Sequence, residues 1–274
     1  MIKPRLDLAL RPALPISSFL LLSFLLLSWL AAPRPAAAWG PTGHRVVGRL
    51  AESYLSATAR QAVESLLGPD SLTEVTTWAD DIRPDPASAP FENWHYVNTE
   101  DGVELNLDPG NHQGELLRTL EAQRTVLCDP SRPREQRRDA VRWLAHLIGD
   151  LHQPLHIGRA SDRGANYVLV LWQNQPSNLH EVWDDKMIET TRLSFSEFVE
   201  FLDPVAAPEQ TAWKQGSFLD WARESHALRK AAYETGDGRL GYKYSWTHMP
   251  TLRQRLQQAG VRLATVLEGC LGGS

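Results

Sequence analysis

The sequence predicts a mainly α-helical protein whose mature part is a single domain. Apolar residues recur at the i, i+3, i+4 and i+7 spacing of helices over most of the chain after residue 38. Only residues 166–172, NYVLVLW, have the apolar and β-branched character of a strand or small hairpin. No internal repeat or low-complexity linker divides residues 39–274, which we therefore expect to form one domain.

The first 38 residues are typical of an export signal. Three basic residues precede an apolar stretch of about 15 residues, and Ala36–Ala38 supplies the small residues that a signal peptidase requires. The alternative is a membrane anchor, which needs roughly 20 apolar residues to span a bilayer. We therefore expect cleavage after Ala38, which would leave a soluble protein that is secreted or periplasmic and begins at Trp39.

Helical spacing predicts five helical regions in the mature chain. They are expected at residues 44–68, with a break near Leu55 and Ser56, and at residues 111–128, 134–152, 208–233 and 250–270. Prolines close to the ends of these regions supply start and stop signals, and Pro250 is expected in the first turn of the last helix. Residues 77–110 are rich in Pro, Asp and Asn and are expected to form a loop.

Cys128 and Cys270 are the only cysteines in the chain. An oxidising compartment would allow a disulfide between them. The sequence does not establish that they lie close together, so a disulfide and two free thiols both remain open.

The charge balance excludes a protein that binds duplex DNA through a basic surface. The predicted leader contains four of the 28 Lys and Arg residues and one of the 33 Asp and Glu residues, which leaves a net charge of −8. Proteins that neutralise DNA phosphates with their own side chains are basic. A polyanionic substrate would therefore have to be met by something other than Lys and Arg.

Histidine and aspartate gather in a few short motifs. His146 and Asp150 are four residues apart on a predicted helix, and the same spacing recurs between His180 and Asp184. Such a pair can be an ordinary hydrogen-bonded pair in the core. However, further motifs contain Asp80, His95, His156 and His44. Imidazole and carboxylate together suit zinc, so the sequence indicates a site for several zinc ions.

The motif WGPTGH at the expected new amino terminus has a metal-binding interpretation of its own. Cleavage before Trp39 would create a free α-amine, whose ordinary pKa is near 8. This amine and the Trp39 carbonyl oxygen can chelate one metal ion, and His44 can complete the site. The indole would hold the terminus in the core. The alternative is an aromatic residue that merely anchors the end of the chain.

Five motifs resemble, in order and spacing, those of the zinc-dependent type I nucleases of plants and fungi (the S1/P1 nucleases). The motifs are WGPTGH, WADDIR, WHYVN, LAHLIGDLHQPLH and NLHEVWD, and they cover residues 39–184. The resemblance implies a helical fold of the phospholipase C/nuclease type and an endonuclease that cuts single-stranded DNA and RNA. Products with 5′-phosphates and a 3′-nucleotidase activity are also implied. A monomer without membrane association is expected.

The resemblance also implies three zinc ions held at the bottom of a cleft. Asp80, His95, His146 and Asp150 would hold the first. The Trp39 amine and carbonyl, His44 and Asp150 would hold the second, and His156, His180 and Asp184 the third. Three zinc ions would meet the phosphates of single strands, oligonucleotides or 3′-mononucleotides without a basic surface. His152 is not a ligand in the family and is expected to pack near the site, whereas Asp81 and His248 are expected to face solvent.

Three residues carry the catalysis that the resemblance implies. Asp150 would bridge two zinc ions that activate a water molecule, and Asp80 would orient that water. Arg83 would stabilise the charge on the pentacovalent phosphorus, although an exposed loop arginine is the alternative.

Base binding is implied for three other residues. Tyr96 offers a ring on which a base can stack. Asn98 stands where better-known members of the family carry Asp, which changes the hydrogen bonds available to a base. Asn166 is expected to support the site loop, in which Ala165 replaces the second of two glycines.

Two other functions remain open. A bacterial zinc-dependent phospholipase C also ligates zinc through an amino-terminal Trp, but it has a longer gap before the His that corresponds to His44 and a Glu in place of Asp184. It also carries an added lipid-binding domain, for which the chain has no segment. The second alternative is a non-catalytic exported zinc-binding protein, in which protein ligands would close every zinc site.

Overall fold

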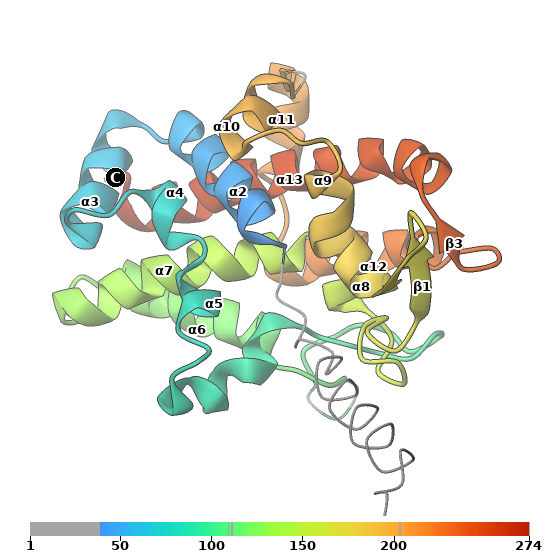
Figure 1. Ribbon diagram of the computed structural model, residues 1–274. Coiled ribbons are helices and arrows are strands. Elements are labelled where there is room, and N and C mark those ends of the chain that lie inside the picture. Colours follow the sequence, from blue (N-terminus) through green and yellow to red (C-terminus); the bar gives the residue numbers. More distant parts are fainter. Residues whose placement is uncertain (1–38, 109, 111, 203, 274) are drawn as a thin grey trace, which may run out of the picture. The chain divides into compact units, whose positions relative to one another are not determined.

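The computed structural model describes residues 39–108, 110, 112–202 and 204–273 (Figure 1). The predicted export signal, residues 1–38, lies outside the described residues. These described residues belong to one compact unit that is mainly α-helical and contains a small three-stranded sheet, as predicted. None of the described helices is both long enough and apolar enough to cross a bilayer.

Helix α7 (Arg134–Leu151) lies at the centre of the core. Every residue from Val141 to Leu151 except Arg142 is buried, because apolar and small residues occupy all faces of its last turns. Helices α6 (Leu116–Cys128), α2 (Pro41–Tyr54) and α13 (Tyr242–Leu271) pack against α7, and α13 also packs along α2 (Figure 1). The carboxyl end of α7 is therefore enclosed by other elements, which is the setting of the predicted site.

The predicted break near Leu55 and Ser56 is confirmed. Helix α2 ends at Tyr54, and α3 (Ala57–Leu67) begins after Ser56, whose side chain accepts a hydrogen bond from the amide of Ala59. This is a normal helix start, since a serine cap satisfies an amide that has no partner within the helix. Helix α4 (Leu72–Val75) follows and leads toward the site.

The prediction of a loop over residues 77–110 is wrong in part. The segment contains α5 (Trp78–Asp81) and the 3-10 helix η2 (Pro86–His95), whose first turn is capped by the side chain of Asp85. Helix α5 has only four residues, and η2 has the three residues per turn of a 3-10 helix, so the 3.6-residue period of an α-helix could not reveal them. They matter for the site because α5 carries Asp80 and η2 ends at His95.

Two predicted helix boundaries also differ. The region 208–233 is divided into α11 (Ala207–Trp213) and α12 (Phe218–Ala232), because Gly216 adopts a positive φ of 93° and Ser217 then caps α12. Helix α13 begins at Tyr242, so Pro250 lies inside the helix rather than in its first turn. The remaining short helices are η3 (Pro154–Ile157), α8 (Leu179–Glu181), the π-helix η4 (Val182–Lys186), α9 (Met187–Glu189) and α10 (Phe195–Glu200).

The predicted strand is confirmed as β1 (Leu169–Trp172). It pairs antiparallel with β2 (Gln175–Asn178) and parallel with β3 (Arg239–Leu240). The sequence QPSN of β2 is polar and contains a proline, which is why its strand character was missed. The hairpin leads directly into α8, where His180 lies.

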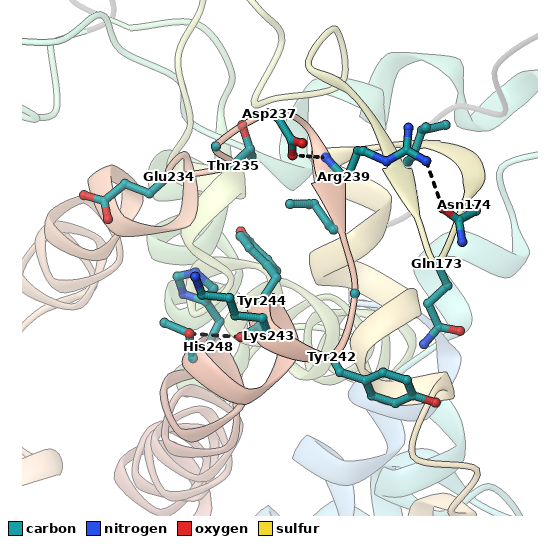
Figure 2. Close-up of a pocket in the computed structure, with 15 residues that line it drawn as sticks. Gln173, Asn174, Glu234, Thr235, Asp237, Arg239, Tyr242, Lys243, Tyr244 and His248 are labelled. Atoms are coloured by element: carbon teal, nitrogen blue, oxygen red, sulfur yellow. Dashed lines mark hydrogen bonds between the residues drawn. The ribbon is translucent and has the colours of Figure 1, made fainter.

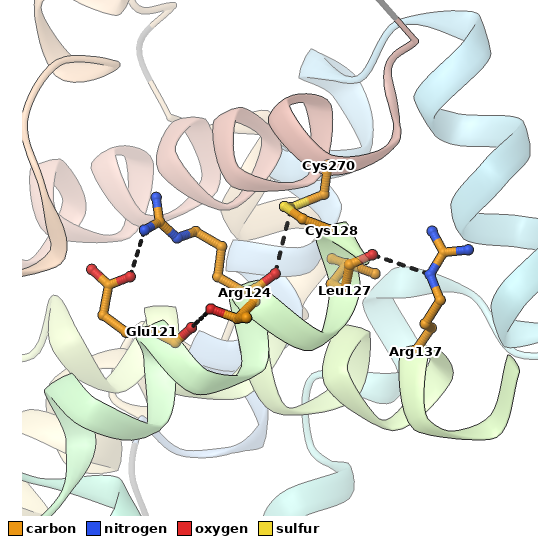
Figure 3. Close-up of a disulfide and its surroundings, with 7 residues drawn as sticks. Glu121, Arg124, Leu127, Cys128, Arg137 and Cys270 are labelled. Carbon is orange, nitrogen blue, oxygen red and sulfur yellow. Dashed lines mark hydrogen bonds and ion pairs between the residues drawn. A yellow bond between two sulfur atoms is a disulfide. The ribbon is translucent and has the colours of Figure 1, made fainter. Parts of the chain in front are cut away.

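The two cysteines form a disulfide, which settles the alternative left open by the sequence (Figure 3). Cys128 is the last residue of α6, and Cys270 lies in the last turn of α13. The disulfide therefore joins two helix ends that are 142 residues apart in the sequence. It lies near the amino-terminal half of α7, since Arg137 of α7 donates a hydrogen bond to the carbonyl of Leu127 (Figure 3).

Candidate metal centre

His146 and Asp150 lie on one face of α7, as their spacing predicts, and both are fully buried. The Nδ1 atom of His146 donates a hydrogen bond to the carbonyl of Thr76 over 2.7 Å. Because that proton occupies Nδ1, the lone pair of Nε2 points into the site. Nε2 lies 3.4 Å from Asp150 Oδ2 and 3.0 Å from His95 Nδ1.

Asp150 lies between two groups of histidines. Its Oδ2 atom is 3.0 Å from His95 Nδ1, on the side of His146. Its Oδ1 atom is 3.4 Å from His44 Nε2, on the other side. One carboxylate thus presents a separate oxygen to each group, which is the arrangement that a bridging ligand needs.

Helix α2 brings His44 to this centre. The His44 ring stacks on the ring of His146, with 4.0 Å between centroids and 15° between planes. It also lies against the backbone of Gly149, where a Cβ atom would come within 2.9 Å of His44 Nδ1. This contact explains a glycine inside a buried helix.

Trp39 is fully buried, and its indole donates a hydrogen bond to the carbonyl of Gly149. The expected burial of Trp39 is therefore confirmed, whereas ligation by its amine and carbonyl stays a prediction.

Asp80 and Arg83 lie at the edge of the same centre. Asp80, His95 and His146 each offer one donor atom, and these atoms lie within 4.8 Å of one another. Asp80 Oδ1 is 3.8 Å from His146 Nε2 and 3.2 Å from Arg83 Nε. The Asp80 side chain is 18% exposed and that of Arg83 is 24% exposed, so both border the surface while the histidines do not. An arginine beside a metal-binding carboxylate is well placed to meet a phosphate.

The three residues expected to hold the third zinc ion lie together beyond the end of α7, and we call them the third group. His156 of η3, His180 of α8 and Asp184 of η4 are all buried and have donor atoms within 4.8 Å of one another. His156 Nδ1 donates to the carbonyl of His95, and His180 Nδ1 donates to the carbonyl of Gly164. The π-helix η4 carries Asp184, and such widened turns are frequent at functional sites.

The donor atoms in these groups fit a metal ion. The Nε2 atoms of His156 and His180 face each other at 3.2 Å, although both rings have their proton on Nδ1. Two lone pairs at this distance repel each other unless a proton or a metal ion lies between them. Several other buried atoms make no hydrogen bond, namely both ring nitrogens of His44, Asp150 Oδ1 and Asp184 Oδ2. Buried polar atoms are normally satisfied, and nitrogen with carboxylate oxygen is a donor set typical of zinc and related ions.

The pKa shifts of His44, His95 and Asp184 favour the protonation states that metal ligands require, whereas that of His146 runs the other way. Burial lowers the pKa of His44, and it lowers the pKa of His95 to about 4, so both rings are neutral near pH 7. Burial raises the pKa of Asp184, but His180 and His156 outweigh it and bring this pKa to about 2. Burial lowers the pKa of His146, yet Asp150 and Asp80 raise it overall to about 9. The carboxylates around His146 therefore favour positive charge at its Nε2, which a metal ion would also supply.

The residues expected to bind a base have defined partners within the protein. Tyr96 is partly buried and follows His95 directly. Asn98 is buried, and its Oδ1 accepts a hydrogen bond from the amide of Gly158. Asn166 donates to the carbonyl of Arg163 within a tight turn. Asn98 and Asn166 thus support the loops beside the third group, and contacts of these residues with a base stay a prediction.

Three other residues test the remaining expectations. His152 is fully buried and packs near the site, as expected, with its Nε2 accepting a hydrogen bond from Arg262. Asp81 is exposed, as expected. The expectation for His248 is wrong, because its ring is buried against Tyr244 and Trp183. Its place on the inner face of α13 was hidden, since the helix begins eight residues earlier than predicted.

Sequence reasoning missed Gln153 as a residue of this centre. Its side chain is fully buried and donates a hydrogen bond to Asp184 Oδ1 over 2.7 Å. The residue lies between His152 and His156, but a glutamine is not a ligand type, so nothing in the composition of the motif singled it out.

A separate hollow lies at the start of α13 (Figure 2). The turn between β1 and β2, strand β3 and the first turns of α13 line it, and none of the predicted ligands is among its lining residues. It borders Tyr244, whose hydroxyl accepts a hydrogen bond from Trp183, the residue before Asp184. The hollow is therefore a neighbour of the third group and not part of it.

Buried His and Asp donors gathered in groups inside a helical fold are the kind of site that a metal-dependent enzyme has. The chain belongs more narrowly to the S1/P1 nuclease family, whose model matches residues 39–272. It is 31% identical over 267 residues to Endonuclease 2 of Arabidopsis thaliana, an alignment that covers 85% of this chain and 91% of that protein. It is 28% identical over 261 residues to Nuclease P1 of Penicillium citrinum, covering 82% and 95% of the two chains.

A shorter alignment joins the chain to Nuclease S1 of Aspergillus oryzae. The two are 29% identical over 167 residues, which covers 58% of this chain and 57% of that protein. Family membership makes the protein a nuclease, a phosphodiester hydrolase that acts on nucleic acid. This result favours the nuclease over the phospholipase C alternative.

Proposed function

We propose that the protein is an exported, zinc-dependent endonuclease that hydrolyses single-stranded DNA and RNA to products with 5′-phosphates. It also removes phosphate from 3′-mononucleotides. The observation that carries the proposal is the set of three groups of His and Asp donors, which are buried except for Asp80. Two of the groups share His146, and Asp150 presents one oxygen to His44 and the other to His95. The pattern of residues 1–38 supports export, and the names of the relatives support the endonuclease activity.

Three zinc ions are proposed, one for each group. Asp80, His95, His146 and Asp150 hold the first, and His156, His180 and Asp184 hold the third. The second lies between His44, Asp150 and the amine and carbonyl of Trp39. Burial of Trp39 and its hydrogen bond to Gly149 support this last assignment, because they bring the start of the mature chain to the end of α7.

The side chains at the open edge perform the remaining chemistry. Bound zinc supplies positive charge for the phosphate and lowers the pKa of a water molecule toward 7. Asp80, which is partly exposed, accepts a hydrogen bond from the attacking water and fixes its direction. Arg83 donates hydrogen bonds to phosphate oxygens as charge builds on them, a contact worth about 2.7–4 kcal/mol in comparable sites. Asp150 remains ionised and keeps the two histidine groups at a fixed separation.

Base stacking holds the substrate, and the limited access to the buried ligand groups selects it. Tyr96 stacks on a base, which contributes about 1–3 kcal/mol. Asn98 and Asn166 hold the loops beside this position. The nearly complete burial of the ligand groups favours a flexible single strand, an oligonucleotide or a 3′-mononucleotide over a rigid duplex. We propose that the protein acts as a monomer without stable membrane association.

One set of assays tests the proposal. The mature protein is incubated with single-stranded DNA, RNA, a 3′-mononucleotide and phosphatidylcholine, with and without a chelator. We expect hydrolysis of the first three substrates, loss of activity with chelator, and recovery when zinc is added back. Hydrolysis of the phospholipid alone would support the phospholipase alternative. Zinc binding without hydrolysis of any substrate would support the non-catalytic alternative.

A further inference from the structure

The side chain of Gln153 joins two elements of the third group. Gln153 lies between the end of α7 and the 3-10 helix η3, and it is fully buried. Its Oε1 accepts a hydrogen bond from the amide of Leu155, and its Nε2 donates to Asp184 Oδ1 over 2.7 Å. An amide N–H requires an acceptor and a carboxylate requires a donor, so the orientation of the Gln153 amide is fixed by its two partners.

Because of this contact, the two oxygens of Asp184 have different partners. Oδ1 receives the hydrogen bond of Gln153. Oδ2 makes no hydrogen bond and lies 3.1 Å from the bare Nε2 atom of His180. Oδ1 also lies 3.6 Å from His156 Nε2. The amide therefore fixes the rotation of the carboxylate, so that Oδ1 faces His156 and Oδ2 faces His180.

The backbone that carries Gln153 is held from the side of α13. Arg255 Nε donates to the carbonyl of His152 over 3.2 Å, and Arg262 Nη1 donates to His152 Nε2 over 2.9 Å. Both arginines are buried and pair with Glu224. None of these contacts involves a ligand of the third group. The backbone next to Gln153 is therefore held by contacts that do not depend on an ion in the third group.

We propose that Gln153 is a positioning residue that sets the affinity of the third metal site by fixing the Asp184 carboxylate. The inference rests on the proposed function, because it assumes that His156, His180 and Asp184 bind a metal ion. The side-chain hydrogen bonds of Gln153 reach no ligand of the other two groups. Its effect is therefore confined to one ion of the three. Residues that orient metal ligands typically change metal affinity 10–100-fold when they are replaced.

Two variants separate the amide from the rest of the side chain. Gln153→Glu keeps an acceptor for the Leu155 amide but turns a carboxylate toward Asp184. Gln153→Met removes the donor without adding charge and retains a similar length. Gln210→Glu is the control, since Gln210 is a partly buried glutamine that also donates a hydrogen bond, to the carbonyl of Val205, and its helix α11 carries no ligand of the three groups.

Zinc per chain is measured by elemental analysis after dialysis against buffers of graded free zinc, and unfolding is followed by circular dichroism. The wild type and Gln210→Glu should lose the third ion at the same low free zinc concentration. In both Gln153 variants one ion should be lost at a free zinc concentration 10–100-fold higher than in the wild type, while two remain bound.

Two results overturn the positioning role. One is three ions with unchanged affinity in both Gln153 variants, and the other is an equal loss from all three sites, which would mean that Gln153 only stabilises the turn. A wild type that binds no third ion would contradict the proposed function itself, so the two failures can be distinguished.

Discussion

Asp150 is the single residue on which most of the metal centre depends. It is fully buried, and each of its oxygens faces a different histidine group. Burial by itself raises the pKa of Asp150, but His146 and His156 outweigh this effect and lower the pKa well below its ordinary value. The carboxylate is therefore negative near pH 7, and the histidines around it face a negative charge.

Asp150→Asn should remove nearly all activity. Asparagine has the same shape but no charge, so it cannot bridge two zinc ions, and hydrolysis of single-stranded DNA should fall by more than about 100-fold. Elemental analysis should find fewer than three zinc ions per chain. Asp81→Asn is the control, because Asp81 is exposed and hydrogen-bonds only to Thr77 among the described residues. Three zinc ions in Asp150→Asn would contradict the bridging role.

At the scale of elements, the start of α2 is locked against two parts of the centre. The indole of Trp39 donates to Gly149 in α7, and the amide of Gly40 donates to the carbonyl of Asp184 in η4. A Cβ atom at position 40 would lie 1.5 Å from Asp185 Oδ1, so a side chain there would require Asp185 to move. The chain therefore enters α2 along one path, and the Trp39 backbone is fixed beside His44.

One residue retained before Trp39 should damage the second zinc site. The α-amine would become a peptide nitrogen, which does not bind zinc, so zinc content should fall from three to two per chain. The rate of single-strand hydrolysis should fall with it. A protein with one residue added after Ser274 is the control for the added length. Full activity and three zinc ions in the extended protein would rule out the amine as a ligand.

The disulfide between α6 and α13 should stabilise the fold without contributing to the chemistry. It lies near the amino-terminal half of α7, whereas His146 and Asp150 lie near the opposite end (Figure 3). Replacing both cysteines by serine should reduce the free energy of unfolding by about 2–5 kcal/mol, the usual loss for a native disulfide. Thermal unfolding should show a lower Tm, while zinc content at 25 °C stays at three. Loss of zinc at that temperature would contradict this separation.

The elements that could be predicted are those with a physical signal in their own residues. The break at Ser56 and the strand β1 have such signals in a helix cap and a β-branched run. Single-turn helices such as α5 and the polar strand β2 have none, because packing against α7 and β1 holds them in place. The site divides in the same way. Ligand types in spaced motifs predicted which histidines meet, whereas Gln153 was invisible until its contact with Asp184 was known.

At the scale of the whole molecule, the charge distribution separates binding from catalysis in an unusual way. Residues 39–274, the chain without its predicted leader, have a net charge of −8 and so repel a polyanion at long range. The site, by contrast, would hold three divalent cations. Attraction is therefore confined to the few phosphates that reach the metal centre and Arg83.

The salt dependence of the reaction should accordingly be weak. For single strands the logarithm of the binding constant falls with the logarithm of salt concentration by about 0.7 for each phosphate neutralised. We expect a slope shallower than about −2 for 1/KM on single-stranded DNA, because only one to three phosphates are met. The measurement varies sodium chloride at constant free zinc, with a 3′-mononucleotide as the control. A slope steeper than −4 would show that a basic surface has been overlooked.

The hydrogen bonds at Trp39 and Gly40 have a consequence for the producing cell. If the Trp39 amine is a zinc ligand, the unprocessed precursor has an amide where the enzyme needs a base, and its cluster stays incomplete. Leader removal on export then doubles as the activation step. The cell's own RNA and DNA would be spared during synthesis without any inhibitor, because the nuclease matures only after it has left the compartment that holds them.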